Sequence, residues 1–187
     1  MENRYIEEDV RKRLILAGLE ELCEHGIRDF SLRRVALSAQ VSCAAPYRHF
    51  KDKEELIAAI VTDIFSKWDL LCRAIEMSHS TDPIAHAAEL AVASIRFWLA
   101  NGNFRTVLML DGAQSPQFGE LMQKFDRAFL SAVDKCLTGR DAESVSAKKL
   151  SLRALIYGTV LLLSTGRAEN SPDAILSVKQ RIVAELS

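Results

Sequence analysis

The stretch from residue 26 to residue 53 constrains the fold of this chain more than any other. It reads GIRDFSLRRVALSAQVSCAAPYRHFKDK, in which two short helical segments flank a three-residue turn. Ser31 stands where its hydroxyl can cap the first helix. The apolar residues of that helix recur at helical spacing on one face, at Leu32, Val35, Ala36 and Ala39. The pattern predicts a helix-turn-helix.

The second half of the motif follows directly. Residues 40–42 form the predicted turn, and Ser42 is placed to cap a second helix from Cys43 to His49. Tyr47 and Phe50 can anchor this helix by their aromatic rings. Its exposed face would then be free to enter a groove of DNA.

Positive charge gathers on the same stretch. From Arg28 to Lys53 there are six Lys and Arg against two Asp and Glu, a net +4, whereas the whole chain has 24 against 25 and a net −1. A DNA reader needs cations only where phosphates approach, because neutralising phosphates releases their counterions. The alternative is an ordinary solvated helix face.

Residues 8 to about 60 resemble the DNA-binding half of the tetracycline-repressor (TetR) family of bacterial regulators. Two departures stand out. Gln40 occupies a turn position where the family usually has Gly, which would cost on the order of 1 kcal/mol if the backbone there has a positive φ. Pro46 lies in the first turn of the second helix, where its ring is tolerable. The matching pieces are Leu14-Ile15, Ala17-Gly18, Gly26, Ser31, Val35-Ala36, Val41-Ser42, Tyr47-Arg48-His49-Phe50 and Lys53-Glu54.

This resemblance implies a set of DNA contacts. Arg33 would reach a base edge or a phosphate, since its guanidinium can bind guanine or a phosphate oxygen. Small side chains would face the major groove at Cys43, Ala44 and Ala45, and the DNA backbone would be held by Tyr47, His49 and Lys53. The full expected set is Ser31, Arg33, Ser42, Cys43, Ala44, Ala45, Tyr47, Arg48, His49 and Lys53. Asp52 looks like the cap of the next helix, so a phosphate near Lys53 would also meet free N–H groups.

The rest of the chain predicts helices only. Apolar residues recur every three or four positions, and Asp82-Pro83, Ser115-Pro116 and Ser171-Pro172 are helix starts. We expect an all-α fold, with a three-helix DNA-binding domain at 1–53 and a helical bundle for ligand binding and dimerisation at 54–187. The predicted helices are 6–25, 31–39, 43–49, 53–77, 83–101, 103–110, 116–138, 144–165 and 172–186.

The last two of these helices are expected to form a homodimer. Few polar positions remain on 144–165, where the apolar residues are Leu150, Leu152, Ala154, Leu155, Ile156 and Val160 to Leu163, and Gly158 permits close approach. Residues 153–158, RALIYG, also resemble the family's dimer helix. The alternative is a central core helix. A dimer would place two recognition helices about 34 to 36 Å apart, on the two halves of a palindrome.

An apolar effector pocket is the second expectation for the bundle, since the resemblance places the family's effectors there. The candidate lining residues are Phe65, Trp68, Trp98, Phe104, Met109, Met122, Phe125 and Tyr157. They suit a flat aromatic or lipophilic small molecule. For each residue the alternative is plain core packing.

Other chemistry finds little support. The cysteines, at 23, 43, 72 and 136, have no C-x-x-C spacing, which argues against a disulfide framework or a zinc site. Oxidation of Cys43 could abolish DNA binding, although the simpler interpretation is a small groove-facing side chain. His79, His86 and Glu89 make a thin case for a metal, so we expect no metal and no cofactor. Catalytic motifs, a secretory signal and an apolar run of about 18 residues are not found, so we expect a cytoplasmic protein that is not an enzyme.

The sequence thus predicts a dimeric, ligand-responsive transcriptional regulator, and the resemblance favours a repressor released from its palindromic operator by a small molecule. The alternative is a helical-bundle enzyme or small-molecule carrier that uses the N-terminal motif as an interaction platform. Sequence-specific, salt-dependent DNA binding would separate the two.

Overall fold

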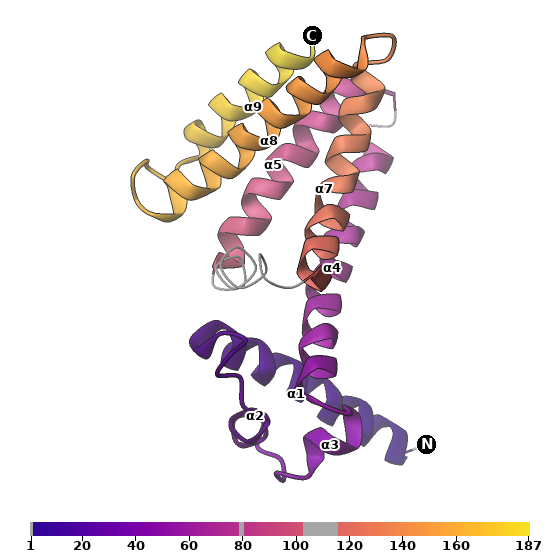
Figure 1. The fold of residues 1–187 in the computed structure, drawn as a ribbon, viewed down its shortest axis with the longest axis vertical. Coiled ribbons are helices and arrows are strands. Elements are labelled where there is room, and N and C mark those ends of the chain that lie inside the picture. Colours follow the sequence, from indigo (N-terminus) through magenta and orange to yellow (C-terminus); the bar gives the residue numbers. More distant parts are fainter. Residues whose placement is uncertain (1, 79–80, 103–115) are drawn as a thin grey trace. The chain divides into compact units, whose positions relative to one another are not determined.

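The computed structural model describes residues 2–78, 81–102 and 116–187, and within these ranges the chain forms helices without any strand (Figure 1). The all-α prediction is confirmed. The predicted helix 103–110 lies outside the described residues. The helices are α1 (Glu2–His25), α2 (Leu32–Ser38), α3 (Ala45–His49), α4 (Lys53–Ser78), α5 (Pro83–Ala100), α7 (Pro116–Cys136), α8 (Ala142–Ser164) and α9 (Pro172–Leu186).

Side-chain caps begin several of these helices as the sequence predicted. Asp82 accepts hydrogen bonds from the backbone N–H groups of Ile84 and Ala85, at 3.0 and 2.9 Å, and Pro83 follows it at the first helical position. Ser171 caps α9 in the same way ahead of Pro172. A cap that we did not predict, Asp141, starts α8 two residues earlier than expected.

The chain divides into two compact units, which we describe separately. Unit 1 contains the described residues up to Lys67 and the first turn of α7, and unit 2 contains Trp68–Gly102 and Glu120–Ser187. Helix α4 contributes residues to both units. This division does not test a domain boundary after residue 53, which stays a prediction.

In unit 1, α1 contacts both α2 and α3, and these two short helices contact each other. Apolar residues from three helices and from the connections fill the interior: Leu14, Leu22, Phe30, Val35, Ala36, Phe50, Leu56 and Ile60. Gly18 lets α1 approach α4 closely, because a Cβ atom at this position would lie 2.7 Å from Cδ1 of Ile60. The core thus holds the helix-turn-helix on α1.

In unit 2, α5 is the central helix and contacts α8 and α9 (Figure 1). Most of its residues from His86 to Trp98 are buried. Helix α8 buries one face, but it leaves large apolar side chains exposed on another. These are Leu150, Leu161 and Leu162, which are 67%, 56% and 45% exposed.

Candidate nucleic-acid interface and effector region

Helix α2 has one buried face and one exposed face, as the apolar spacing predicted. Ser31 is its N-cap, and the Ser31 hydroxyl accepts a bond from the Arg34 N–H at 3.5 Å. Val35 and Ala36 are fully buried, whereas Arg33 and Leu37 are exposed. Arg33 is therefore available to a partner outside the domain.

The turn contains a strained residue. Gln40 has a φ of 55°, and among the described non-glycine residues it alone has a positive φ. This confirms the conformation that we considered from the sequence. The Val41 N–H donates to the Ala36 carbonyl at 3.0 Å, which closes the turn. The chain therefore adopts a left-handed turn without the glycine that would favour it.

Helix α3 begins two residues later than predicted, at Ala45. Ala44 is its N-cap and makes no side-chain capping bond, so the predicted cap by the Ser42 side chain is wrong. Instead, the Ser42 carbonyl accepts from the Ala45 N–H at 2.9 Å. Pro46 lies in the first turn, where no N–H is needed. Cys43 therefore precedes α3 and is not its first residue.

The predicted contact residues differ in exposure. Six are exposed, namely Arg33, Ser42, Cys43, Ala44, Tyr47 and Arg48, and Tyr47 reaches 65%. Ser31, His49 and Lys53 are half-buried. Ala45 is only 8% exposed and packs within the domain, so the expectation that it faces the groove is corrected. The other expected contacts are each at least partly exposed, and their roles in DNA binding stay predictions.

Asp52 caps α4, as the sequence indicated. Its carboxylate accepts from the Glu55 N–H at 2.8 Å, and the Glu55 carboxylate accepts from the Lys51 N–H at 2.6 Å. The two bonds are close to a capping box. They fix Lys53 in the first turn of α4.

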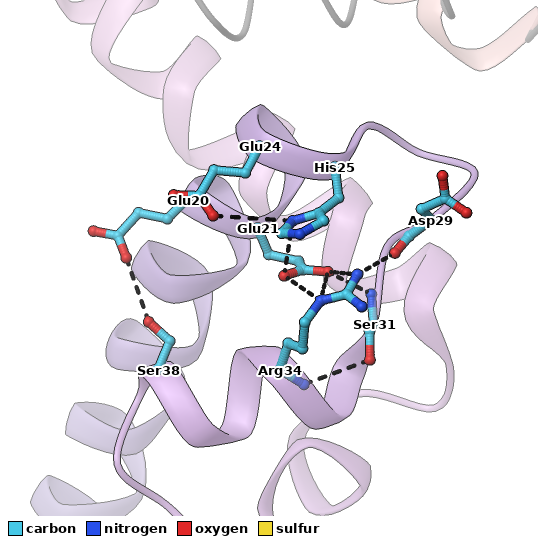
Figure 2. A network of polar contacts seen from close by, with 8 residues as sticks. All are labelled: Glu20, Glu21, Glu24, His25, Asp29, Ser31, Arg34 and Ser38. Atoms are coloured by element: carbon cyan, nitrogen blue, oxygen red, sulfur yellow. Dashed lines mark hydrogen bonds and ion pairs between the residues drawn. The ribbon is translucent and has the colours of Figure 1, made fainter.

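The sequence reasoning missed a polar network between α1 and α2. Glu21 of α1 is 6% exposed, and its carboxylate accepts from Nε of Arg34 at 2.9 and 3.0 Å (Figure 2). The backbone N–H of Ser31 also donates to this carboxylate, at 2.9 Å. A signal was present, because Glu21 lies seven residues after Leu14 on the buried face of α1, where a charge needs a partner. Because its guanidinium is paired with Glu21, Arg34 is not a freely available cation for DNA.

Opposing effects act on the Glu21 carboxyl. Burial alone raises its pKa, but the hydrogen bond and charge of Arg34 and the N–H of Ser31 outweigh burial, so the pKa lies below its ordinary value. His25 adds a weaker favourable contribution, with Nδ1 3.4 Å from the carboxylate. Glu21 therefore stays ionised at neutral pH.

In unit 2, three of the predicted effector residues pack against one another. Trp68 stacks on Phe125 with ring centroids 4.2 Å apart, and Trp98 lies 4.6 Å from Phe125. Trp68 Nε1 donates to the Phe125 carbonyl at 3.2 Å. The three side chains are at most 2% exposed. Phe104 and Met109 lie outside the described residues, as does the side chain of Met122, and the buried Phe65 belongs to unit 1.

Tyr157, the remaining predicted effector residue, joins α8 to α7. Its hydroxyl donates to Oδ1 of Asp126 at 2.8 Å, and Nη2 of Arg153 lies 2.8 Å from Oδ2 of Asp126. Burial and the Asp126 charge raise the pKa of Tyr157, so this phenol keeps its proton. Tyr157 and Arg153 thus provide bonds to the carboxylate of Asp126, which is only 7% exposed.

Unit 2 also contains a polar cleft that the sequence did not suggest. It has a volume of about 280 Å³ and lies between α4, α5 and α7. Its walls carry Asp69, Cys72, Arg73, Glu76, His86, Leu90, Ala128, Ser131, Ala132 and Lys135. Burial, with the nearby Asp69 and Glu76, raises the pKa of the Cys72 thiol to about 12. This thiol is therefore protonated and a poor nucleophile.

Other sites can be described briefly. Within the described ranges, no three His, Cys, Asp or Glu side chains gather to hold a metal ion. Glu89, one residue of the thin metal case, instead pairs with Lys179 of α9, and His79 is outside the described residues. All four cysteines are free thiols. No described helix is both long and apolar enough to span a lipid bilayer.

Known proteins match this architecture. Residues 14–60 match the family described as bacterial regulatory proteins, tetR family. A TetR family transcription regulator from Marinobacter aquaeolei VT8 is 18% identical, with 97% of each chain covered and a TM-score of 0.71. A transcriptional regulator from Rhodococcus sp. Rha1 is 20% identical, with 94% of this chain and 95% of that chain covered and a TM-score of 0.71.

The transcriptional regulator FadR from Bacillus subtilis, solved in complex with stearoyl-CoA, is 17% identical, with coverages of 94% and 96% and a TM-score of 0.68. No curated protein sequence matches the chain. At these identities the solved structures establish the fold. The chain therefore has the TetR-family fold, with an N-terminal helix-turn-helix domain whose residues 14–60 match the model of that family.

Proposed function

We propose that the protein binds a palindromic operator as a homodimer and represses transcription until a small molecule binding in unit 2 releases it. The observation that carries this proposal is the division of α2 and α3 into two faces. Val35, Ala36 and Ala45 are buried, whereas Arg33, Tyr47 and Arg48 are exposed together with the small Cys43 and Ala44. Cations and a phenol suit phosphates and base edges, and small side chains allow close approach to the groove.

The apolar surface of α8 supports the homodimer. Leu150, Leu161 and Leu162 are exposed in the single chain, and Leu176 of α9 is 51% exposed. A Cβ atom at Gly158 would meet nothing within 4 Å beyond the local backbone of its own helix, so this part of α8 has room for a second helix. A two-fold pair would bury these leucines and present two copies of α3 to the DNA.

The release step rests on the bundle fold of unit 2. A protein of this fold was solved in complex with stearoyl-CoA, which supports a small-molecule site in the bundle. Among the described side chains of unit 2, the proposed walls are Trp68, Trp98, Phe125 and Tyr157. The effector must bind one conformation of the dimer more tightly than the other, because equal affinity shifts no equilibrium.

The primary test is fluorescence-anisotropy titration of the purified protein against the DNA upstream of its own gene, at several salt concentrations. We expect binding that competitor DNA does not displace, with affinity falling steeply as salt rises. The variants Tyr47→Phe and Lys53→Gln should weaken binding to every site alike. Arg33→Ala should relax base preference if Arg33 reads a base edge. The matched control is Lys67→Gln, which removes an exposed charge of α4 that pairs with Asp63 and leaves affinity unchanged.

Two further measurements test the dimer and the release. Leu161→Glu should give monomers in sedimentation, whereas Leu70→Glu, at an equally exposed leucine of α4, should leave the dimer intact. Stearoyl-CoA and flat aromatic compounds can be screened by quenching of the Trp68 and Trp98 fluorescence. A compound that binds tightly without changing operator affinity would contradict the release step.

A further inference from the structure

Helices α2 and α3 have seven and five residues, which is too short for either to be stable alone in water. Their orientation must come from what holds them. Part of the hold is apolar, through Val35 and Ala36 of α2 and Phe50 after α3. Apolar contacts are non-directional, so they set the distance between helices better than they set a rotation about the helix axis.

Directional contacts come from two consecutive residues of α1. Glu21 reaches the first turn of α2, where it accepts bonds from the Ser31 N–H and from the Arg34 guanidinium (Figure 2). Glu20 lies 3.4 Å from the hydroxyl of Ser38, the last residue of α2. Helix α2 is thus attached to α1 near both ends by polar bonds of defined geometry.

Arg34 also closes the connection that leads into α2. Besides the Glu21 carboxylate, its Nη2 donates to the backbone carbonyl of Asp29. One guanidinium therefore ties together the end of α1, the connection and the first turn of α2. A lysine could not make this set of bonds, because it lacks the planar fork of donors.

We propose that Glu21 and Arg34 are positioning residues for DNA binding, which orient α2 and, through the three-residue turn, α3. This inference rests on the DNA-binding function proposed above. In this role, Arg34 affects DNA binding through its bonds to Glu21, unlike its neighbour Arg33, whose exposed side chain is proposed to contact DNA directly. The competing role is direct contact, because Arg34 is 47% exposed and could also reach a phosphate.

A double-mutant cycle separates the two roles. Glu21→Leu and Arg34→Met each leave one charge of the pair without its partner, and each should weaken operator binding at least about tenfold. The combined variant should bind within about threefold of the weaker-binding single variant, because the two residues act through the same bonds and their losses therefore do not add. Arg34→Lys should not recover binding, although it keeps the charge.

The matched control combines Glu21→Leu with Arg33→Met, where the two losses should simply add. The slope of log affinity against log salt should be the same in wild type and in the Glu21→Leu/Arg34→Met variant. Direct contact predicts the opposite result: the losses of Glu21→Leu and Arg34→Met add in the combined variant, and the slope falls by about 0.9. That outcome would overturn the proposal, as would wild-type affinity in a folded Glu21→Leu protein.

If Glu21→Leu does not fold, Glu21→Gln serves, because its amide oxygen still accepts from Ser31 while Arg34 loses its carboxylate. A second readout is hydrogen exchange of the Ser31 amide, which should be protected in wild type and in Glu21→Gln but exposed to exchange in folded Glu21→Leu, which lacks the acceptor. Protection lost with unchanged operator affinity would overturn the positioning role alone. Wild-type protein that ignores all upstream DNA would instead overturn the proposed function, whatever the Ser31 amide shows.

Discussion

The two units of the chain hold their helices by different means. Unit 2 has helices of 15 to 23 residues lying wholly or mainly within it, and its α4, α5 and α7 meet at the rings of Trp68, Trp98 and Phe125. Unit 1 places helices of seven and five residues on α1, and there a buried carboxylate binds the start of α2. Long helices can rely on area, whereas short helices need specific bonds. Both units bury aromatic side chains, such as Phe30 and Phe50 in unit 1, but unit 1 also exposes Tyr47, at 65%.

The largest expected effect is in the aromatic cluster. Phe125→Ala should lower the free energy of unfolding of unit 2 by about 3–5 kcal/mol, because it leaves a cavity under Trp68 and Trp98. Urea denaturation followed by tryptophan fluorescence measures this loss. In contrast, Tyr47→Ala should change the free energy of unfolding by no more than about 0.5 kcal/mol while weakening DNA binding. Equal losses of stability in the two variants would break the comparison.

The same contrast explains what the sequence could predict. Apolar spacing and Asp-Pro or Ser-Pro starts predict the position of a long helix, so the predicted ranges 83–101 and 172–186 agree closely with α5 and α9. The predicted N-cap of α3 is wrong. Ser42 is a residue type that often caps helices, but the backbone conformation makes Ala44 the N-cap. Periodicity also could not tell whether Trp98 lines a pocket or fills a core, since both need a buried ring.

The Glu21 network and the polar cleft could not be predicted from such patterns, because both depend on contacts between different helices. Arg34 counts as a cation in any tally of charge, and only the three-dimensional contact with Glu21 shows that it has a partner within the domain. The cleft depends on small side chains from α7, such as Ala128 and Ser131, facing charges on α4. No single helix carries that signal.

The second prediction concerns the one buried carboxylate of α7 among the described residues. Asp126→Asn should keep the hydrogen bond from Tyr157 but turn an amide toward Arg153, at a cost of about 1–3 kcal/mol. Denaturation monitored by fluorescence tests it. The control Arg153→Gln should cost less, since that guanidinium is 44% exposed and water can replace it. An unchanged free energy of unfolding in Asp126→Asn would show that unit 2 gains no stability from the charge of Asp126.

The third prediction is a gain of stability in the turn. A left-handed conformation costs a non-glycine residue about 1–2 kcal/mol, and the greater freedom of glycine in the unfolded chain returns about 0.4–1 kcal/mol. Gln40→Gly should therefore stabilise unit 1 by up to about 1 kcal/mol, as measured by thermal melting. The control Leu37→Gly, at an exposed position of α2, should destabilise it by about 1 kcal/mol. If both changes destabilise, the Gln40 side chain contributes a contact that outweighs its backbone strain.

The smallest effect is the dependence of unit 1 on acid. The pKa of Glu21 in the folded chain lies below its ordinary value of 4.5, so its contribution to stability is fully present above that value. As the pH falls, the unfolded chain takes up the proton first, and the contribution is lost as the pH passes through the folded pKa. The effect stays small because Arg34 is half-exposed and solvent screens the pair. Urea midpoints measured at successive pH values should fall more steeply for wild type than for Glu21→Gln, which has no proton to bind at this position. Parallel curves would mean that the carboxylate acts on α2 through its hydrogen bonds and not through its charge, and unit 1 would then depend on geometry alone.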